Sequence, residues 1–265
     1  MKIGSLENHR SRESGVLVYP VYSRRSRGLS LGINLFPDGK ACSFDCPYCE
    51  VFPFPPSAEF NLEKMETDLR SAISAAREQD AVIKDICFSG NGEPSLSPHF
   101  PKALEKAFII RNETAPEAQL VLITNGSGLL HKGIFDLLVK NAQAGLNIWL
   151  KVDAGTEGWY KKINRAQNCD FSLLLNRIRE FSALAPFIVQ TMICQVEGQP
   201  PSQEEEEAWA KLVTELATPG KLRSVQIYGK ARPSPEDPLA EALDLSFLEK
   251  RAGVLPPSIP VEVFP

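Results

Sequence analysis

Residues 119–152, with the sequence QLVLITNGSGLLHKGIFDLLVKNAQAGLNIWLKV, decide the fold class of this 265-residue chain. Gln119–Thr124 and Asn147–Val152 are short, mostly apolar runs of the length that strands have. The pattern between them predicts a helix over 131–144, and Gly145 follows it, where glycine is favoured just past a helix C-terminus. A strand, a helix and a second strand in this order predict two parallel strands joined by a right-handed crossover.

The same alternation extends along the chain on both sides of this segment. Six strand–helix units suit an open barrel or a doubly wound parallel sheet, and in both folds the active site lies at the C-terminal ends of the strands. Ser202 and Glu205 predict a capping box, and the acidic run 204–207 is interpreted as charge at a positive helix N-terminus. The other expected strands are 29–36, 81–89, 187–196 and 222–228, and the other expected helices are 62–78, 98–111 (with Pro98 in its first turn), 170–184 (with Asp170 as N-cap), 203–216 and about 239–251.

Composition describes an ordinary globular protein, with 43% hydrophobic residues, 23% charged residues and a net charge of −4. These values exclude a disordered chain and a coiled coil. The pattern shows no membrane span and no signal peptide, so we expect a cytoplasmic protein without a membrane partner. We expect a basic N-terminal extension over 1–28, a main domain over 29–232 and a Pro-rich C-terminal extension over 233–265 that packs on it. The basic segment is either a solvated arm or a contact for an anionic substrate such as nucleic acid.

The strongest chemical signal is the run Cys42-Ser43-Phe44-Asp45-Cys46-Pro47-Tyr48-Cys49, directly after the first expected strand. Thiolates this close repel one another unless a cation shares them, so the spacing indicates a metal site. Zinc usually takes four ligands, and no second cysteine pair exists in the chain. An iron–sulfur cluster on three thiolates would leave one iron open to another ligand. A zinc site or a structural cluster remains the alternative. Cys87 and Cys194 lie within apolar strands and are expected to be buried, and Cys169 lies in a loop.

Polar residues follow three further strands. Gly90-Asn91-Gly92-Glu93 follows 81–89, and its glycines allow close approach of a ligand to the backbone. Asn125 follows Thr124 and is either a ligand contact or a turn-forming residue. Lys151 and Asp153 end a strand, where alternation places them on the same side. They form either a binding pair or an ion pair that serves only solubility.

The C-x3-C-x2-C spacing, with an aromatic residue before the last cysteine, resembles the cluster loop of the radical SAM superfamily. The resemblance implies an α/β fold, a partial (β/α)6 barrel of parallel strands with helices outside, and an enzyme that reductively cleaves S-adenosylmethionine (SAM) at a [4Fe-4S] cluster. The resulting 5′-deoxyadenosyl radical would abstract hydrogen from a substrate. The implied residues are Cys42, Cys46 and Cys49 for the cluster, Tyr48 near the adenine, Gly92 and Glu93 at the SAM amino group, Asn125 at its carboxylate, and Lys151 and Asp153 at the ribose or the substrate.

Further segments narrow the resemblance to a prokaryotic branch related to the radical SAM core of wybutosine synthases, which modify tRNA. These segments are 20–25, 29–34, Gly92–Leu96, Asp153-Ala154-Gly155 and Lys162-Ile163-Asn164-Arg165. No second cysteine group and no flavodoxin-like domain are visible, so we expect an external electron donor of the flavodoxin or ferredoxin type. The substrate is RNA, a protein or a small molecule. The rival interpretation is a non-catalytic iron–sulfur or zinc protein in electron transfer or scaffolding, in which Gly92-Glu93 has no role.

Overall fold

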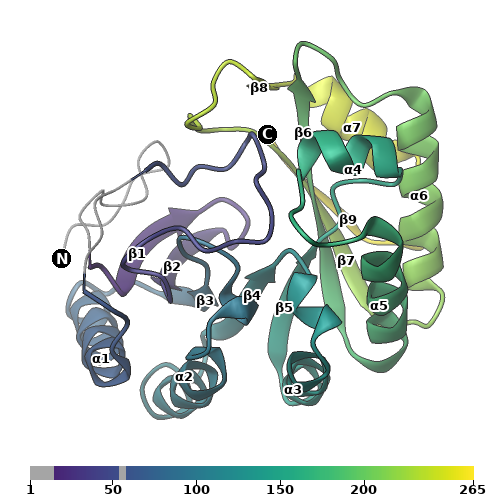
Figure 1. The fold of residues 1–265 in the computed structure, drawn as a ribbon. Helices are drawn as coiled ribbons and strands as arrows, with labels where there is room; N and C mark the ends of the chain where they lie inside the picture. The colour runs from purple at the N-terminus through teal and green to yellow at the C-terminus, as the bar shows by residue number, and fades with distance from the viewer. Residues whose placement is uncertain (1–14, 54–57) are drawn as a thin grey trace. The chain divides into compact units, whose positions relative to one another are not determined.

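The computed structural model describes residues 15–53 and 58–265, which form two compact units (Figure 1). The first unit comprises the described parts of Met1–Cys42 and Pro53–Thr124, together with Gly145–Asn147. The second comprises Ser43–Phe52, Asn125–Ala144 and Ile148–Pro265. Each unit has its own strands and helices and is described separately below.

The first unit is built on four strands in the order β1-β2-β3-β4. β1 pairs antiparallel with β2, whereas β2, β3 and β4 pair in parallel. Helices α1 and α2 lie side by side on one face of these strands (Figure 1). The elements are β1 (Val18–Ser23), β2 (Gly28–Ile33), α1 (Leu62–Glu78), β3 (Ile83–Phe88), the 3-10 turn η1 (Pro94–Leu96), α2 (Phe100–Thr114) and β4 (Gln119–Thr124).

Helix α1 shows how the sequence produces this packing. The Asn61 side chain accepts a hydrogen bond from Lys64 N at 2.8 Å and so starts the helix. Its buried face repeats at helical spacing and includes Met65, Leu69 and Ile73. The bounds expected from this periodicity, 62–78, are confirmed.

The second unit carries four parallel strands in the order β5-β6-β7-β9, with β8 antiparallel to β6. β6 is buried along nearly its whole length, as expected for a strand covered on both faces. The first residues of β5 are grouped with the first unit. The elements are the 3-10 turn η2 (Ser127–Leu130), α3 (Lys132–Gln143), β5 (Leu146–Lys151), α4 (Glu157–Ile163), α5 (Phe171–Leu184), β6 (Phe187–Val196), α6 (Gln203–Ala217), β7 (Leu222–Gly229), β8 (Ala240–Ala242), α7 (Leu245–Gly253) and β9 (Val261–Phe264).

The alternation of parallel strands and helices confirms the expected α/β class. Two expected helices were placed wrongly. Helix α2 begins at Phe100, so Pro101 rather than Pro98 occupies its first turn. The helix expected over about 239–251 starts later, at Leu245, because residues 240–242 pair with the end of β6 as β8.

One helix and three strands were not expected from the sequence: α4, β1, β8 and β9. β1 falls within the expected N-terminal extension, of which residues 1–14 lie outside the described part of the chain. β9 falls within the expected C-terminal extension and pairs in parallel with β7. The domain boundaries at residues 28 and 232 stay predictions. None of the described helices is both long and apolar enough to cross a membrane.

Candidate functional site

In the first unit, the turn after β3 fixes the backbone that leads into the cysteine loop. Ala41 N donates to Asn91 O at 3.0 Å, and Glu93 N donates to Ala41 O at 2.8 Å. A Cβ atom on Gly92 would stand only 1.8 Å from Ala41 O. Gly92 is therefore required by the close approach of the chain's own backbone, one residue before Cys42.

The Glu93 carboxylate is buried in the first unit and has protein partners. Its Oε1 accepts from Ser95 N at 3.1 Å, from Ser95 Oγ at 2.5 Å and from Thr124 Oγ1 at 2.7 Å. The side chain thus caps η1 and joins the end of β3 to the end of β4. These contacts place Glu93 at the C-terminal ends of the strands, where the sequence predicted it.

The second unit contains the later part of the cysteine loop. Cys49 N donates to Cys46 O at 3.0 Å, which closes a tight turn around Tyr48. Cys42, Cys46 and Cys49 are half-buried free thiols, whereas Cys87, Cys169 and Cys194 are buried. Burial of Cys87 and Cys194 confirms the prediction for both. Within residues 15–53 and 58–265, no three His, Cys, Asp or Glu side chains gather closely enough to hold a metal ion.

Asp153 is the centre of a buried polar cluster in the second unit. Its Oδ2 accepts from Tyr48 Oη at 2.5 Å and from Asn164 Nδ2 at 2.8 Å. Its Oδ1 accepts from Met192 N, on β6, at 2.9 Å. Both carboxylate oxygens are therefore occupied by donors from three separate segments of the unit.

Lys151 lies beside this carboxylate, with its ammonium 3.3 Å from Asp153 Oδ2. The ammonium also donates to the hydroxyl of Tyr228 and lies 4.9 Å from the centre of the Tyr48 ring. The Lys151 side chain is 14% exposed and that of Asp153 is fully buried. This burial excludes the alternative of a surface pair that serves only solubility.

Burial shifts the pKa values of the ionisable groups in and beside this cluster. Burial raises the pKa of the Cys46 thiol from 9.0 to about 12, although the Lys151 ammonium lowers it. Burial also raises the pKa of the Tyr48 hydroxyl, and the Asp153 carboxylate raises it further. Burial alone would lower the pKa of Lys151, but Asp153, Tyr228 and Cys46 together more than offset this effect, so the pKa lies above its usual value. Lys151 is therefore a permanent cation beside Cys46.

Asn125 has the turn-forming role that was one of its two predicted roles. Its Oδ1 accepts from Ser127 N at 2.9 Å. Its Nδ2 also donates to Ser43 Oγ at 3.3 Å, and Ser43 Oγ donates to Ser127 Oγ at 2.7 Å. Asn125 therefore lies beside the cysteine loop as well as forming the turn after β4.

The segment after Asp153 is fixed by α6. A Cβ atom on Gly155 would stand 2.1 Å from Trp209 N, so only glycine fits there. The Glu205 carboxylate accepts from Gly155 N at 2.6 Å and from Thr156 N at 2.8 Å. Only half of the predicted capping box forms: Ser202 Oγ accepts from Glu205 N at 3.2 Å, while the Glu205 carboxylate turns to this loop.

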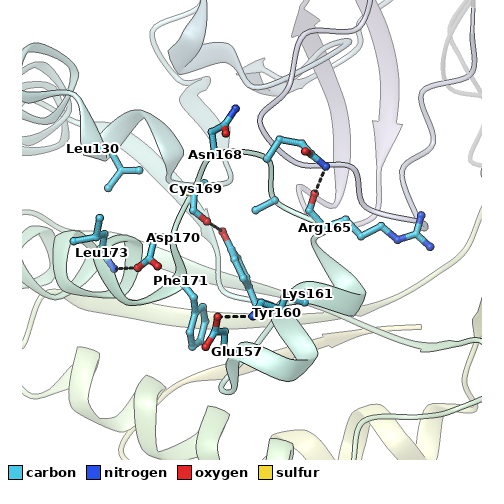
Figure 2. Close-up of a pocket in the computed structure, with 12 residues that line it drawn as sticks. Leu130, Glu157, Tyr160, Lys161, Arg165, Asn168, Cys169, Asp170, Phe171 and Leu173 are labelled. Carbon is cyan, nitrogen blue, oxygen red and sulfur yellow. Dashed lines mark hydrogen bonds and ion pairs between the residues drawn. The ribbon is translucent and has the colours of Figure 1, made fainter.

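A cavity of about 610 Å³ lies in the second unit, between α4, the segment 165–170 and the start of α5 (Figure 2). Figure 2 shows Tyr160 directed at the segment that carries Cys169, whose carbonyl accepts from Tyr160 Oη at 3.2 Å. The Tyr160 ring also packs edge-on against Phe44 of the cysteine loop, with 5.6 Å between ring centres. Tyr160 therefore both lines this cavity and contacts the cysteine loop.

Asn164 and Tyr228 belong to this site, yet neither was predicted from the sequence to have a role. Asn164 was visible only as part of the segment Lys162-Ile163-Asn164-Arg165. Tyr228 was visible only as the last residue of an expected strand. Neither signal identifies a partner, because the contacts to Cys46, Asp153 and Lys151 join residues far apart in the sequence.

Comparisons with known proteins agree with this geometry. A family model described as the radical SAM superfamily matches residues 36–205. A UPF0026 protein of Helicobacter pylori is 26% identical over 178 residues, which cover 66% of this chain and 54% of the relative. The chain thus spans about half the length of the curated relative it matches.

Two solved structures show the fold. A radical SAM methyltransferase from Sphaerobacter thermophilus superposes with a TM-score of 0.69 at 14% identity, over 93% of this chain and 69% of that one. A structure of TYW1 with a lysine-pyruvate adduct gives a TM-score of 0.56 at 12% identity, over 84% of this chain and 72% of that one. The expected partial (β/α)6 barrel class is confirmed by this likeness. The chain belongs to the radical SAM superfamily, whose members bind a [4Fe-4S] cluster and SAM.

Proposed function

We propose that this chain is an enzyme that binds a [4Fe-4S] cluster through Cys42, Cys46 and Cys49 and cleaves SAM reductively. When bound, such a cluster would supply one electron for the cleavage of SAM into methionine and a 5′-deoxyadenosyl radical, which would abstract hydrogen from a substrate. The observation that carries the proposal is the buried cluster of Asp153, Lys151 and Tyr48, which lies beside Cys46 at the C-terminal end of β5. Ligand sites of parallel α/β folds lie at this end of the strands.

The chemistry of the donor set fits the proposed cofactor, although the three thiols do not gather around a single ion site within the described residues. Three free thiols within one loop are soft ligands of the kind that iron–sulfur clusters take. Cys46 is protonated at neutral pH without a metal, because burial raises its pKa to about 12. Ligation must therefore release this proton, and the Lys151 ammonium stabilises the thiolate that remains.

The residues proposed to contact SAM are Tyr48, Gly92, Glu93, Asn125, Lys151 and Asp153. Their contacts suggest different tasks. Asp153 has both oxygens occupied by protein donors, which supports a role in holding Tyr48 rather than a direct contact. Glu93 is already fixed through Oε1 by Ser95 and Thr124, which supports a preorganised carboxylate for the SAM ammonium.

An external donor, a flavodoxin or ferredoxin, is proposed to reduce the cluster. We propose RNA as the substrate class. Its support is the basic turn that joins β1 to β2 and contains Arg24, Arg25 and Arg27. Binding of tRNA should weaken steeply with salt, and replacing the three arginines with glutamine should flatten the slope of log K against log salt by about 2–3. An unchanged slope would argue for a protein or a small molecule as substrate.

Anaerobic reconstitution tests the cofactor assignment. Wild-type protein supplied with iron and sulfide should retain about four irons per chain. Single alanine variants of Cys42, Cys46 and Cys49 should lose most of this iron, while Cys87→Ala and Cys194→Ala should retain it. Addition of SAM should change the EPR spectrum of the reduced cluster. Retention of zinc in place of iron would contradict the proposal, and a cluster that ignores SAM would favour the non-catalytic alternative.

A further inference from the structure

Asn164 follows the last residue of α4 and is 2% exposed. Its Nδ2 donates to Asp153 Oδ2 at 2.8 Å and lies 3.7 Å from Cys46 Sγ, within reach of an N–H···S hydrogen bond. A carboxamide nitrogen carries two hydrogens. One hydrogen can therefore bind Asp153 while the other is directed at the sulfur.

Two contacts join Cys46 to Asn164, and ligation of the sulfur to a cluster decides which of them can persist. The Cys46 thiol can donate to Asn164 O, which lies 3.7 Å away. A thiolate has no hydrogen to donate and can only accept. The Lys151 ammonium also acts on Cys46 through its charge, and the Tyr48 hydroxyl directs its proton to Asp153 Oδ2 at 2.5 Å. The Asn164 carboxamide has a second hydrogen, in addition to the one bound to Asp153, that can be directed at the sulfur.

The orientation of the carboxamide is fixed by rigid elements. Asp153, directly after β5, holds the Asn164 side chain, and Met192 N on β6 holds the other oxygen of Asp153 at 2.9 Å. The Cys46 sulfur is thus supported by a second layer of residues, Asn164 and Asp153, which is anchored to β6 through Met192 N. Such a layer tunes the cofactor without touching the substrate.

We propose that Asn164 is a positioning residue whose carboxamide donates an N–H···S hydrogen bond to Cys46 and raises the reduction potential of the bound cluster. The inference rests on the proposed function, because it requires that Cys46 is a cluster ligand. Reduction places additional negative charge on the ligand sulfurs, and a donor at the sulfur stabilises that charge. Hydrogen bonds to sulfur are among the factors that set the potentials of iron–sulfur clusters.

The contact can be removed without releasing the loop. Asn164 O accepts from Asp45 N at 3.0 Å, and Gln167 N donates to Ser43 O at 2.7 Å. Both bonds use backbone atoms and survive a change of side chain. Asn164→Leu keeps the approximate volume and removes both N–H donors, and the exposed Asn176→Leu on α5 is the matched control.

The test is an EPR-monitored redox titration of the reconstituted cluster. Asn164→Leu should reduce the equilibrium constant for one-electron reduction on the order of tenfold, which equals about 59 mV toward more negative potential. Asn176→Leu should leave the potential at its wild-type value. A cluster with normal iron content and an unchanged potential in Asn164→Leu would overturn this inference alone.

Two further results complete the test. If wild-type protein assembles no cluster, the proposed function and this inference both fail. If Asn164→Leu does not fold, pulsed EPR of wild-type protein with ¹⁵N-labelled asparagine decides the matter. A ¹⁵N coupling to the reduced cluster supports the hydrogen bond, and its absence overturns it.

Discussion

Removal of the Glu205 carboxylate should destabilise the second unit strongly, because this group holds the loop that follows Asp153. Its oxygens accept from Gly155 N at 2.6 Å, from Thr156 N at 2.8 Å and from Thr156 Oγ1 at 2.6 Å. Its Oε1 also lies 3.7 Å from Nη2 of Arg251, and both side chains are at most 2% exposed. The substitution Glu205→Ala removes all of these interactions.

The buried Arg251 guanidinium increases the loss of stability that we expect for Glu205→Ala. Burial lowers the pKa of Arg251 from 12.5 to about 10, although Glu205 raises it, so the group stays charged at neutral pH. Within the described part of the chain, none of its three nitrogens has a hydrogen-bond partner. The guanidinium also packs on the Trp209 ring, whose centre is 4.3 Å away. Glu205→Ala leaves this cation buried without the carboxylate that acts on it most strongly, although Glu206 and Asp153 still contribute.

The magnitude follows from these contacts. Removing one partner of a buried ion pair costs about 3–5 kcal/mol. Glu205→Ala also leaves Gly155 N and Thr156 N without their acceptor. The cost of these two groups is included in the about 3–5 kcal/mol and is not added to it, because the terms are not additive. A fall of this size should lower the melting temperature by about 6–20 °C in a chain of this length.

Urea unfolding of three variants measures the effect. Arg251→Met should cost only about 1 kcal/mol, because Glu205 retains its loop donors and methionine still packs on Trp209. The double variant should lose about 1–3 kcal/mol less unfolding free energy than the two single variants lose together. The reason is that it contains no buried cation without its partner. Lys250→Met is the control, since the Lys250 ammonium is 61% exposed and its ion pair with Glu206, at 2.9 Å, is open to solvent on the lysine side.

Two results would refute this reasoning. The first is a loss below about 1 kcal/mol for Glu205→Ala, which would mean that water or another donor replaces the carboxylate. The second is strict additivity in the double variant, which would mean that the two side chains do not interact.

Two other substitutions test the site directly. Gly92→Ala should lower the free energy of unfolding by about 1–3 kcal/mol and reduce iron retention, because its Cβ meets Ala41 O, whereas Gly39→Ala has no atom within 4 Å and should change neither quantity. Asp153→Ala should cost about 3–5 kcal/mol in urea unfolding, since it leaves the buried ammonium of Lys151 unpaired. The exposed Asp136→Ala should stay within about 0.5 kcal/mol, and equal losses for both aspartates would contradict the buried cluster.

The regular elements of this fold are predictable because local patterns decide them. The bounds of α1, β4 and β6 agree with the expected ranges 62–78, 119–124 and 187–196. In α1, apolar spacing and an N-cap agree with each other. In β6, a long apolar run is sufficient, because the strand is buried on both faces.

The elements that were missed depend on distant partners. β8 and β9 are short and lie in a Pro-rich segment, and they form because β6 and β7 offer edges to pair with. Glu205 was expected to act at its own helix N-terminus, but it binds a loop 50 residues earlier in the chain. Sequence periodicity carries no information about such contacts.

The candidate site also contains residues that a local sequence pattern predicts and residues whose role only the structure reveals. The spacing of Cys42, Cys46 and Cys49 is a local pattern and identified the loop directly. The sequence predicted that a close approach requires glycine at position 92, but not what approaches it. We expected a ligand there, whereas the structure shows Ala41 O. Asn164 joins Cys46 to Asp153 only in three dimensions, so its role required the structure.

Cleavage of SAM is the most direct test of the central claim. Reconstituted protein should be incubated anaerobically with SAM and dithionite, and 5′-deoxyadenosine should be measured by mass spectrometry, with Cys46→Ala as the control. Formation of 5′-deoxyadenosine by wild-type protein, and its loss in Cys46→Ala, is the result predicted here. An intact cluster that yields no 5′-deoxyadenosine, or an equal yield from Cys46→Ala, would contradict the account.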